Sequence, residues 1–298
     1  MDPSYINAYL VDAPNIFITS RRTPLTDVSR MSYGSFALDD GAFTISEEEY
    51  KEILKKEPCI RSVLKPFIGA KEFINKINRY CVWLDYGDIN LINRSRILTQ
   101  KIQHVKNWRT QSTRKNTLEA ANTPMKFAEI RQPDSDYLGV PVVSSENRKY
   151  IPIGFLSKEI IASNQLFVVP DAEIYHFSIM SSNVHNAWMR MVAGRLEMRY
   201  RYSASIVYNN FPWIILTDEQ KDELTMTGKR ILIARELYPD WSLSDLYNEL
   251  TMPPELRKAH QENDKAVMSA YGFNWRAMTS AECVAELMKM YQNLVQQT

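Results

Sequence analysis

The sequence predicts an α+β fold: a mixed or antiparallel β-sheet with flanking helices, followed by a small all-α helical bundle. Short runs rich in β-branched and aromatic residues, separated by Pro and Gly turns, occur only before about residue 213. Beyond that point helix-capping pairs recur instead. With 298 residues and 45% hydrophobic content, the chain can form two packed domains. We expect one at 1–213 and the other at 214–298.

The first part of the chain predicts strands and one charged helix. Ahead of residue 45, the apolar runs IFIT and FTI are broken by Pro and Gly, as in short strands joined by turns. Ser46 and Glu49 have capping-box spacing, so a helix is expected to begin there and end before Pro58. The run RYCVWL at 79–84 predicts the next strand.

The stretch from residue 89 to 121 predicts one long amphipathic helix. It contains neither Pro nor Gly. Apolar residues recur along it at roughly helical spacing, and Lys and Arg residues give it a basic outer face.

A β-rich region and then more helices are expected. The predicted strands are FAEIRQ, YLGVPVV, KYIPIGF and QLFVVP. Because several contain Pro, edge strands or bulges are expected rather than central strands. Residues 174–202 predict one helix. The helices expected after residue 213 lie near 218–237, 243–249, 254–271 and 280–296, with caps at Thr217, Ser242 and Thr279.

The charge distribution is segmented although the net charge is only +1. Residues 60–131 contain 14 Lys and Arg against 5 Asp and Glu, and acidic segments flank this block. Such a block is either a solvated face or a surface that binds a polyanion.

Known catalytic and metal-binding patterns are missing. The nine glycines are never within two residues of each other, which excludes the common phosphate and methyl-donor loops. The four histidines are scattered, so no metal site is expected. Residues 209–213, NNFPW, differ from the Asn-Pro-Pro-aromatic motif of amino-group methyltransferases and predict a structural corner. No stretch approaches the roughly 18 uncharged apolar residues of a membrane span. Three separated cysteines are typical of reduced thiols in a cytoplasmic protein.

Several long segments, in order, carry a resemblance to a known family. They are NAYLVDAPNIFITSRRTPL, KPFIGAKEFIN followed by RYCVWL, FAEIRQPDSDYLGVPVVSSENRKYIPIGF, SSNVHNAWMRMVAGRLEMRYRYS, VYNNFPW and SLSDLYNELTMPPELRKAHQENDKAVMSAYGF. Together they resemble the C-terminal half of the MmeI-like (type IIL) DNA methyltransferases of bacterial restriction–modification systems.

The resemblance implies a division of labour. Residues 1–213 would be a target recognition domain, with 1–20 as the linker from a preceding methyltransferase domain, and 214–298 a helical C-terminal domain. The parent protein would methylate adenine N6 with S-adenosylmethionine. This chain begins where the methyltransferase domain would end, so we expect no catalytic residues and no cofactor in it. Its expected partners are double-stranded DNA and the parent's methyltransferase domain.

Residues VSSENRKYIPIGF, from Val143 to Phe155, are the strongest candidates for reading bases. Duplex recognition pairs Arg with guanine, Asn or Gln with adenine, and Glu with cytosine. The candidates after the strand are Ser144, Ser145, Glu146, Asn147 and Arg148. A second set, expected on a neighbouring loop, is Arg131, Gln132, Asp134 and Ser135. The alternative is that Glu146 and Arg148 simply pair with each other.

Other cations are expected to neutralise phosphates without reading sequence. They are Lys71, Arg79, Lys101, Lys106, Arg109, Arg114, Lys115, Lys149, Arg190 and Arg195. The alternative function is a protein-interaction or scaffold subunit that binds an acidic partner through the same basic face.

Overall fold

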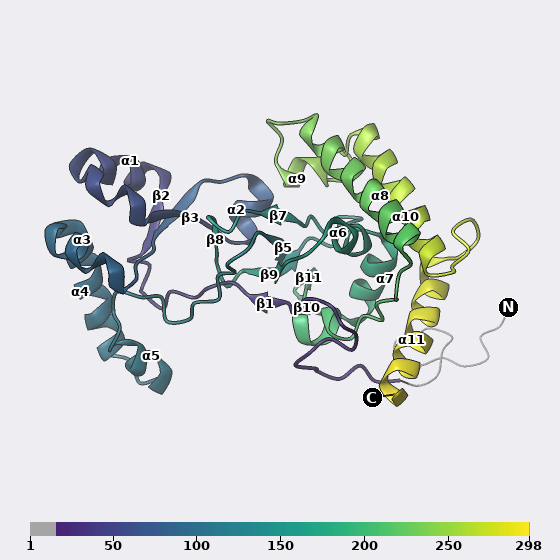
Figure 1. Ribbon diagram of the computed structural model, residues 1–298, viewed down its shortest axis with the longest axis horizontal. Helices are drawn as coiled ribbons and strands as arrows, with labels where there is room; N and C mark the ends of the chain where they lie inside the picture. Colours follow the sequence, from purple (N-terminus) through teal and green to yellow (C-terminus); the bar gives the residue numbers. More distant parts are fainter. Residues whose placement is uncertain (1–15, 298) are drawn as a thin grey trace.

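The computed structural model describes residues 16–297, so most of the expected linker at 1–20 lies outside the described residues. The molecule is elongated (Figure 1). Small helices and a sheet form a lobe at one end, long helices form the other end, and a second sheet lies between them. The α+β class expected from the sequence is confirmed.

The lobe at one end, here called the first lobe, is built on a four-stranded sheet of order β2-β4-β3-β8. Its strands are β2 (Thr44–Ser46), β3 (Leu64–Ile68), β4 (Arg79–Val82) and β8 (Ile161–Ala162). Ser46 caps α1 (Glu47–Lys56) as expected, because its hydroxyl accepts a hydrogen bond from the Glu49 N–H. Phe43, Val105 and Phe127 belong to a separate hydrophobic core that fills this lobe.

The prediction of a single helix over residues 89–121 is wrong. The structure has three helices there, α3 (Ile89–Arg94), α4 (Arg96–Thr110) and α5 (Lys115–Ala120). At the first break the Ser95 hydroxyl accepts from the Leu98 N–H and donates to the Glu57 carboxylate. Glu57 also accepts from the Ile97 N–H at 3.2 Å. A side chain 38 residues earlier therefore fixes where one helix ends and the next begins.

The central sheet is antiparallel, with order β1-β9-β5-β7. Its strands are β1 (Ser32–Tyr33), β5 (Tyr137–Pro141), β7 (Gly154–Leu156) and β9 (Leu166–Pro170). The expectation of edge strands is wrong for β5 and β9, which are both internal. Pro141 and Pro170 are the last residues of their strands, where a missing N–H disturbs the ladder least. The run FAEIRQ forms no strand and contributes one bridge, between Glu129 and Phe36.

The single helix expected over 174–202 is also wrong. The segment forms α6 (Ile174–Met180), α7 (Asn183–Val192), β10 (Gly194–Leu196) and β11 (Arg199–Arg201). Ser182 divides the helices, because its hydroxyl caps α7. The two strands form a hairpin that pairs with β6 (Val143–Ser144), placing Tyr200 opposite Ser144 and Arg201 opposite Val143.

The helices expected after residue 213 are present nearly as predicted. They are α8 (Asp218–Glu236), α9 (Leu243–Leu246), α10 (Pro254–Ala270) and α11 (Ser280–Gln297). Thr217 and Ser242 are the N-caps of α8 and α9, and the Thr279 hydroxyl accepts from the Glu282 N–H ahead of α11. Local capping chemistry therefore set these helix starts.

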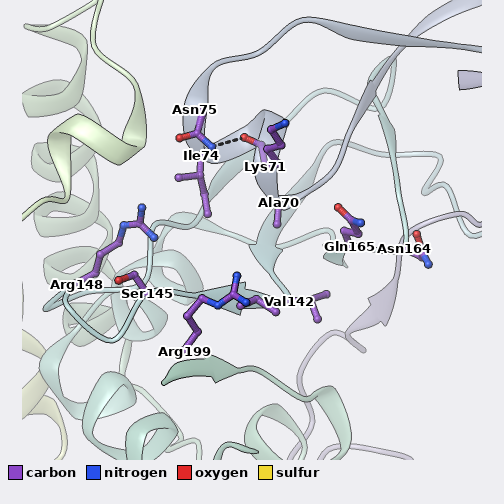
Figure 2. Close-up of a pocket in the computed structure, with 11 residues that line it drawn as sticks. Ala70, Lys71, Ile74, Asn75, Val142, Ser145, Arg148, Asn164, Gln165 and Arg199 are labelled. Atoms are coloured by element: carbon purple, nitrogen blue, oxygen red, sulfur yellow. Dashed lines mark hydrogen bonds between the residues drawn. The ribbon is translucent and has the colours of Figure 1, made fainter. Parts of the chain in front are cut away.

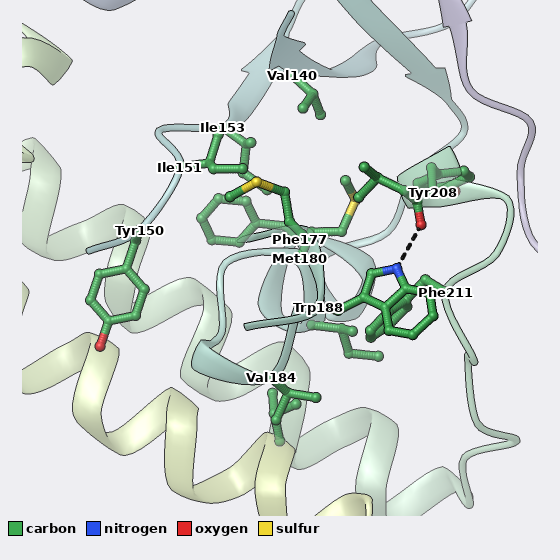
Figure 3. Close-up of a cluster of buried hydrophobic side chains, with 14 of the residues drawn as sticks. Val140, Tyr150, Ile151, Ile153, Phe177, Met180, Val184, Trp188, Tyr208 and Phe211 are labelled. Carbon is green, nitrogen blue, oxygen red and sulfur yellow. Dashed lines mark hydrogen bonds between the residues drawn. The ribbon is translucent and has the colours of Figure 1, made fainter. Parts of the chain in front are cut away.

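One hydrophobic core joins the central sheet to the helical end. It extends from Val140 through Phe177 and Trp188 to Leu287 (Figure 3 shows its central part). The NNFPW segment is the structural corner that was expected. The Asn210 side chain donates only to backbone carbonyls, and Phe211 is completely buried.

Candidate nucleic-acid interface

A cleft of about 510 Å³ separates α2 (Ala70–Asn75) from the loop that follows β6. Figure 2 shows Arg148 and Ser145 on one side of it and the α2 residues on the other, with Arg199 nearby. The lining residues are Ala70, Lys71, Ile74, Asn75, Val142, Val143, Ser145, Arg148, Asn164, Gln165 and Arg199. Seven of these eleven side chains are polar, three of the seven are cationic, and the other four are apolar.

The 145–149 loop presents its polar side chains through a tight turn. The Ser145 hydroxyl accepts from the Asn147 N–H at 3.2 Å, and the Ser145 carbonyl accepts from the Arg148 N–H. The side chains of Glu146 and Asn147 form no hydrogen bond or ion pair within residues 16–297. In the same range no ion pair joins Glu146 to Arg148, so the alternative that they satisfy each other is not observed. The side chains of Glu146 and Asn147 therefore keep hydrogen-bonding capacity that no contact within residues 16–297 uses.

Arg148 is held at the edge of the cleft rather than projecting freely. Its guanidinium is half-buried and donates to the Ser244 hydroxyl of α9 at 3.3 Å. Burial lowers the pKa of Arg148, yet a guanidinium remains charged at neutral pH. The exposed Lys71 from α2 and Arg199 from β11 face the same cleft, and Arg199 also pairs with the exposed Glu197 at 2.8 Å, a contact that solvent screens. The resulting positive potential favours an anionic ligand.

Four polar residues lining the cleft are absent from the sequence-based candidates: Asn75, Asn164, Gln165 and Arg199. Arg199 was missed because residues 174–202 were assigned to a helix. The alternation in RLEMRYR after Gly194 was the available signal for a hairpin. No comparable signal marks the other three, because they are brought to the cleft by chain segments distant in sequence.

The second set of expected base readers lies at the wrong end of β5. Residues 131–135 precede β5 and the 145–149 loop follows it, so about 17 Å of strand separates them. The Gln132 amide donates to the carbonyls of Lys158 and Ile160 and accepts from the Ala162 N–H. Arg131 pairs with Glu129. Asp134 and Ser135 line a different hollow of about 430 Å³ with these two. The expectation of two neighbouring readout loops is therefore wrong.

Arg109 and Lys101 are structural, contrary to the prediction that they contact phosphates. Arg109 is 0% exposed, and its guanidinium donates only to backbone carbonyls. Lys101 donates to the Ala42 carbonyl at 2.7 Å and pairs with Glu49 at 2.8 Å. Neither ammonium nor guanidinium is free for a ligand.

Arg79 and Arg190 are occupied in the same way. Arg79 pairs with the buried Glu72 at 3.0 Å and donates to the Phe67 carbonyl. Arg190 donates to the carbonyls of residues 148 and 149. The predicted phosphate contacts that remain exposed are Lys71, Lys106, Arg114, Lys115, Lys149 and Arg195.

The described part of the chain offers neither a metal site nor a membrane-spanning helix. Within residues 16–297, no group of three or more His, Cys, Asp or Glu residues is placed to hold a metal ion. His176, His185 and His260 are buried. No helix in this range combines the length and apolar composition needed to cross a bilayer.

Comparison with known proteins gives consistent matches along the chain. Residues 12–214 match the family model described as MmeI, target recognition domain, and residues 215–298 match MmeI, C-terminal domain. DNA methyltransferase A of Bacillus subtilis (strain 168) is 38% identical over 293 residues, which are 98% of this chain and 33% of that protein. The chain therefore spans about a third of that relative.

A solved structure of the type IIL restriction-modification enzyme MmeI in complex with DNA is similar throughout. It superposes with a TM-score of 0.94 and 44% identity, covering 98% of this chain and 39% of that one. The type IIG restriction endonuclease BpuSI is more distant, with a TM-score of 0.45 and 12% identity over 83% of this chain and 31% of its own.

Proposed function

The chain belongs to the MmeI family, of which it contains the target recognition and C-terminal domains, and from this premise we propose that it recognises a specific sequence in double-stranded DNA. One observation carries the proposal: a cleft with three cationic side chains is bordered by a loop whose Glu146 and Asn147 side chains form no hydrogen bond or ion pair within residues 16–297, and whose Arg148 guanidinium makes a single one, to Ser244. A purely phosphate-binding surface has no use for Glu146, because a carboxylate repels the DNA backbone. A base-reading surface does have a use for it.

Roles follow from the chemistry of each side chain in the 145–149 loop, which we call the readout loop. Arg148 is assigned to guanine O6 and N7, Asn147 to adenine N6 and N7, and Glu146 to the cytosine amino group. Ser145 lines the cleft and is assigned to a base edge or a nearby phosphate. Ser144, which was expected to read a base, is buried in β6 and lies outside the cleft lining, so it is not assigned a base contact. These contacts would supply sequence preference.

Affinity is assigned to cations that stay exposed. Lys71 and Arg199 border the cleft, and Lys149 is the last residue of the readout loop. Lys106, Arg114, Lys115 and Arg195 extend the exposed basic surface over α4, α5 and the β10–β11 hairpin. Such contacts neutralise phosphates regardless of sequence and release counterions.

In this proposal the chain works as part of a larger adenine-N6 methyltransferase of a restriction–modification system. Residues 1–213 would recognise the target, 214–298 would form the helical domain, and a methyltransferase domain would be the partner. S-adenosylmethionine would supply the methyl group in that domain, while this chain selects the site.

A fluorescence titration with labelled duplexes at several salt concentrations tests the proposal. The duplex enriched by the chain from a random-sequence pool is compared with a scrambled duplex of equal length. Arg148→Ala should lower discrimination by about 1–3 kcal/mol while leaving binding to the scrambled duplex nearly intact. An equal loss on both duplexes would contradict the assignment of Arg148. Absence of saturable, salt-dependent duplex binding would instead favour an acidic protein partner.

A further inference from the structure

The chain that leaves the readout loop is held by several hydrogen bonds from the surrounding helices. Residues 148–153 run between α7 on one side and α8 and α10 on the other. On the α7 side, the Arg190 guanidinium donates to the carbonyls of Arg148 at 2.6 Å and Lys149 at 2.9 Å. The Asn186 side-chain oxygen accepts from the Ile151 N–H at 3.0 Å.

The helices after residue 215 hold the same segment, residues 148–153, from the other side. The Tyr150 hydroxyl donates to Asp264 of α10 at 2.7 Å, across 114 residues of sequence. The Tyr150 ring stacks on His260 with centroids 4.1 Å apart. Figure 3 shows Tyr150 extended from its loop toward these helices. From α8, Arg235 donates to the Ile153 carbonyl at 2.7 Å.

A second buried layer braces these contacts. The Tyr247 hydroxyl is bonded to Arg235 and lies 2.8 Å from the His260 ring nitrogen. The other carboxylate oxygen of Asp264 accepts from the Asn183 N–H at 2.8 Å. Tyr247 and His260 are almost completely buried, and Asp264 is only 8% exposed. The His260 Nδ1 has no hydrogen-bond partner, but each bond named above joins buried or half-buried groups. Losing any one of these bonds leaves a group unsatisfied in a low-dielectric interior, so the bonded groups resist displacement.

The network reaches the readout side chains themselves. Arg148, whose carbonyl is held by α7, also has its guanidinium bonded to Ser244 of α9. Backbone and side chain of the same residue are therefore fixed from opposite sides of the loop. Contacts that served only to stabilise the core would not need to include a partly exposed side chain at the rim of the cleft.

We infer that helices α8, α9 and α10 position the readout loop for base recognition, with Tyr150, Asp264, Arg235 and Ser244 as positioning residues. The inference rests on the proposed function. Hydrogen bonds to base edges are directional, so a reader held in place before binding loses less conformational freedom on contact and rejects wrong bases more strongly. The C-terminal domain would thereby contribute to sequence preference without contacting a base.

Two mild variants and one matched control test this on the full chain. Tyr150→Phe removes only the hydroxyl that reaches Asp264, and Ser244→Ala removes the partner of Arg148. The control is Thr227→Val, which removes a buried hydroxyl of α8 that donates to Asn263 at 2.9 Å. No hydrogen bond within residues 16–297 joins Thr227 to the readout loop. Amide hydrogen exchange of residues 145–149 is measured without DNA, and discrimination is measured with the enriched and scrambled duplexes.

Both variants are expected to speed exchange in the readout loop and to lower discrimination about two- to tenfold, with an unchanged salt slope. Thr227→Val should do neither, even where it lowers the melting temperature. Unchanged loop exchange in both variants, or an equal loss of discrimination in the control, would overturn the inference. If the parent chain shows no sequence preference, the proposed function fails, and the exchange data still decide whether these helices hold the loop.

Discussion

Arg109 and Arg114 occupy the same basic segment of the sequence but are expected to respond oppositely to mutation. Arg109→Met should unfold the first lobe more readily and leave the salt dependence of DNA binding unchanged in the folded protein. Neutralising Arg114 and Lys115 together, each as Gln, should do the reverse. The difference follows from where each side chain lies.

The magnitude for Arg109 comes from its hydrogen bonds. The guanidinium makes five, with lengths of 2.7 to 3.2 Å, and is 0% exposed. The acceptors are the carbonyls of Ala37, Leu38, Ala120, Thr123 and Lys126. At about 0.5–1.5 kcal/mol each, their loss lowers the free energy of unfolding by roughly 3–7 kcal/mol. Met fills similar volume, so the lost bonds dominate the effect.

The magnitude for Arg114 and Lys115 comes from counterion release. Both are exposed, and the 3.9 Å pair between Lys115 and Glu119 is too solvated to hold the ammonium. Each phosphate contact contributes about 0.9 to the slope of log K against log salt concentration. Removing two should therefore reduce the slope by about 1.8 on specific and random duplexes alike.

The assays are urea unfolding for stability and fluorescence titration of both duplexes at several salt concentrations for binding. A stable Arg109→Met variant with a flattened salt slope would refute the reasoning. So would an unchanged slope in the Arg114 and Lys115 variant, since it would remove α5 from the phosphate-binding surface.

Three further results are expected. Burial lowers the pKa of His185 to about 3 and that of His260 well below its ordinary value, so the unfolded chain binds more protons below pH 6.5. Acidification from pH 7 to 5 should thus cost about 2 kcal/mol from His185, and His260 should destabilise the fold in the same direction. About 1 kcal/mol is offset by Asp264, whose burial raises its pKa to about 6; urea midpoints that do not fall would contradict this. Glu146→Gln should alter preference at one base pair without lowering affinity for random duplexes, and an unaltered preference at every position would remove Glu146 from the readout. Transfer of a radiolabelled methyl group from S-adenosylmethionine to DNA should stay at background with this chain alone. Robust incorporation would contradict the expectation that the chain contains no catalytic residues.

The helical end was predictable because its signals are local. The caps at Thr217, Ser242 and Thr279 each act within three residues, so their spacing in the sequence determines where a helix begins. The same holds for Ser46 at the start of α1. The resemblance to the MmeI family, carried by long motifs in order, is likewise confirmed.

The two predictions of a single long helix were wrong because residues distant in sequence determine where these segments break. Ser95 alone does not predict a helix break. The break arises because the Glu57 carboxylate accepts hydrogen bonds from the Ser95 hydroxyl and the Ile97 N–H. The hairpin after Gly194 exists because β6, some fifty residues earlier, offers it an edge to pair with. A sequence window of helical length includes neither Glu57 nor β6, so its hydrophobic periodicity cannot show these contacts. Tertiary contacts of this kind override local helix preference.

The candidate site shows the same division between local and distant causes. The loop at 145–149 could be singled out in the sequence because its run of polar side chains is contiguous, and the structure places Ser145 and Arg148 at the cleft. Its role in reading bases stays a prediction. The residues that hold this loop could not be predicted. Arg235, His260 and Asp264 are isolated polar residues on helices rich in charged residues, where a polar side chain is expected to face solvent. The informative fact is that His260 and Asp264 are buried and Arg235 is half-buried: apolar residues of similar volume would often stabilise a helical core at least as well. Each instead braces the chain that leaves the readout loop. Specific positioning is thus a better explanation for them than stability, which supports our inference that the helical domain takes part in recognition.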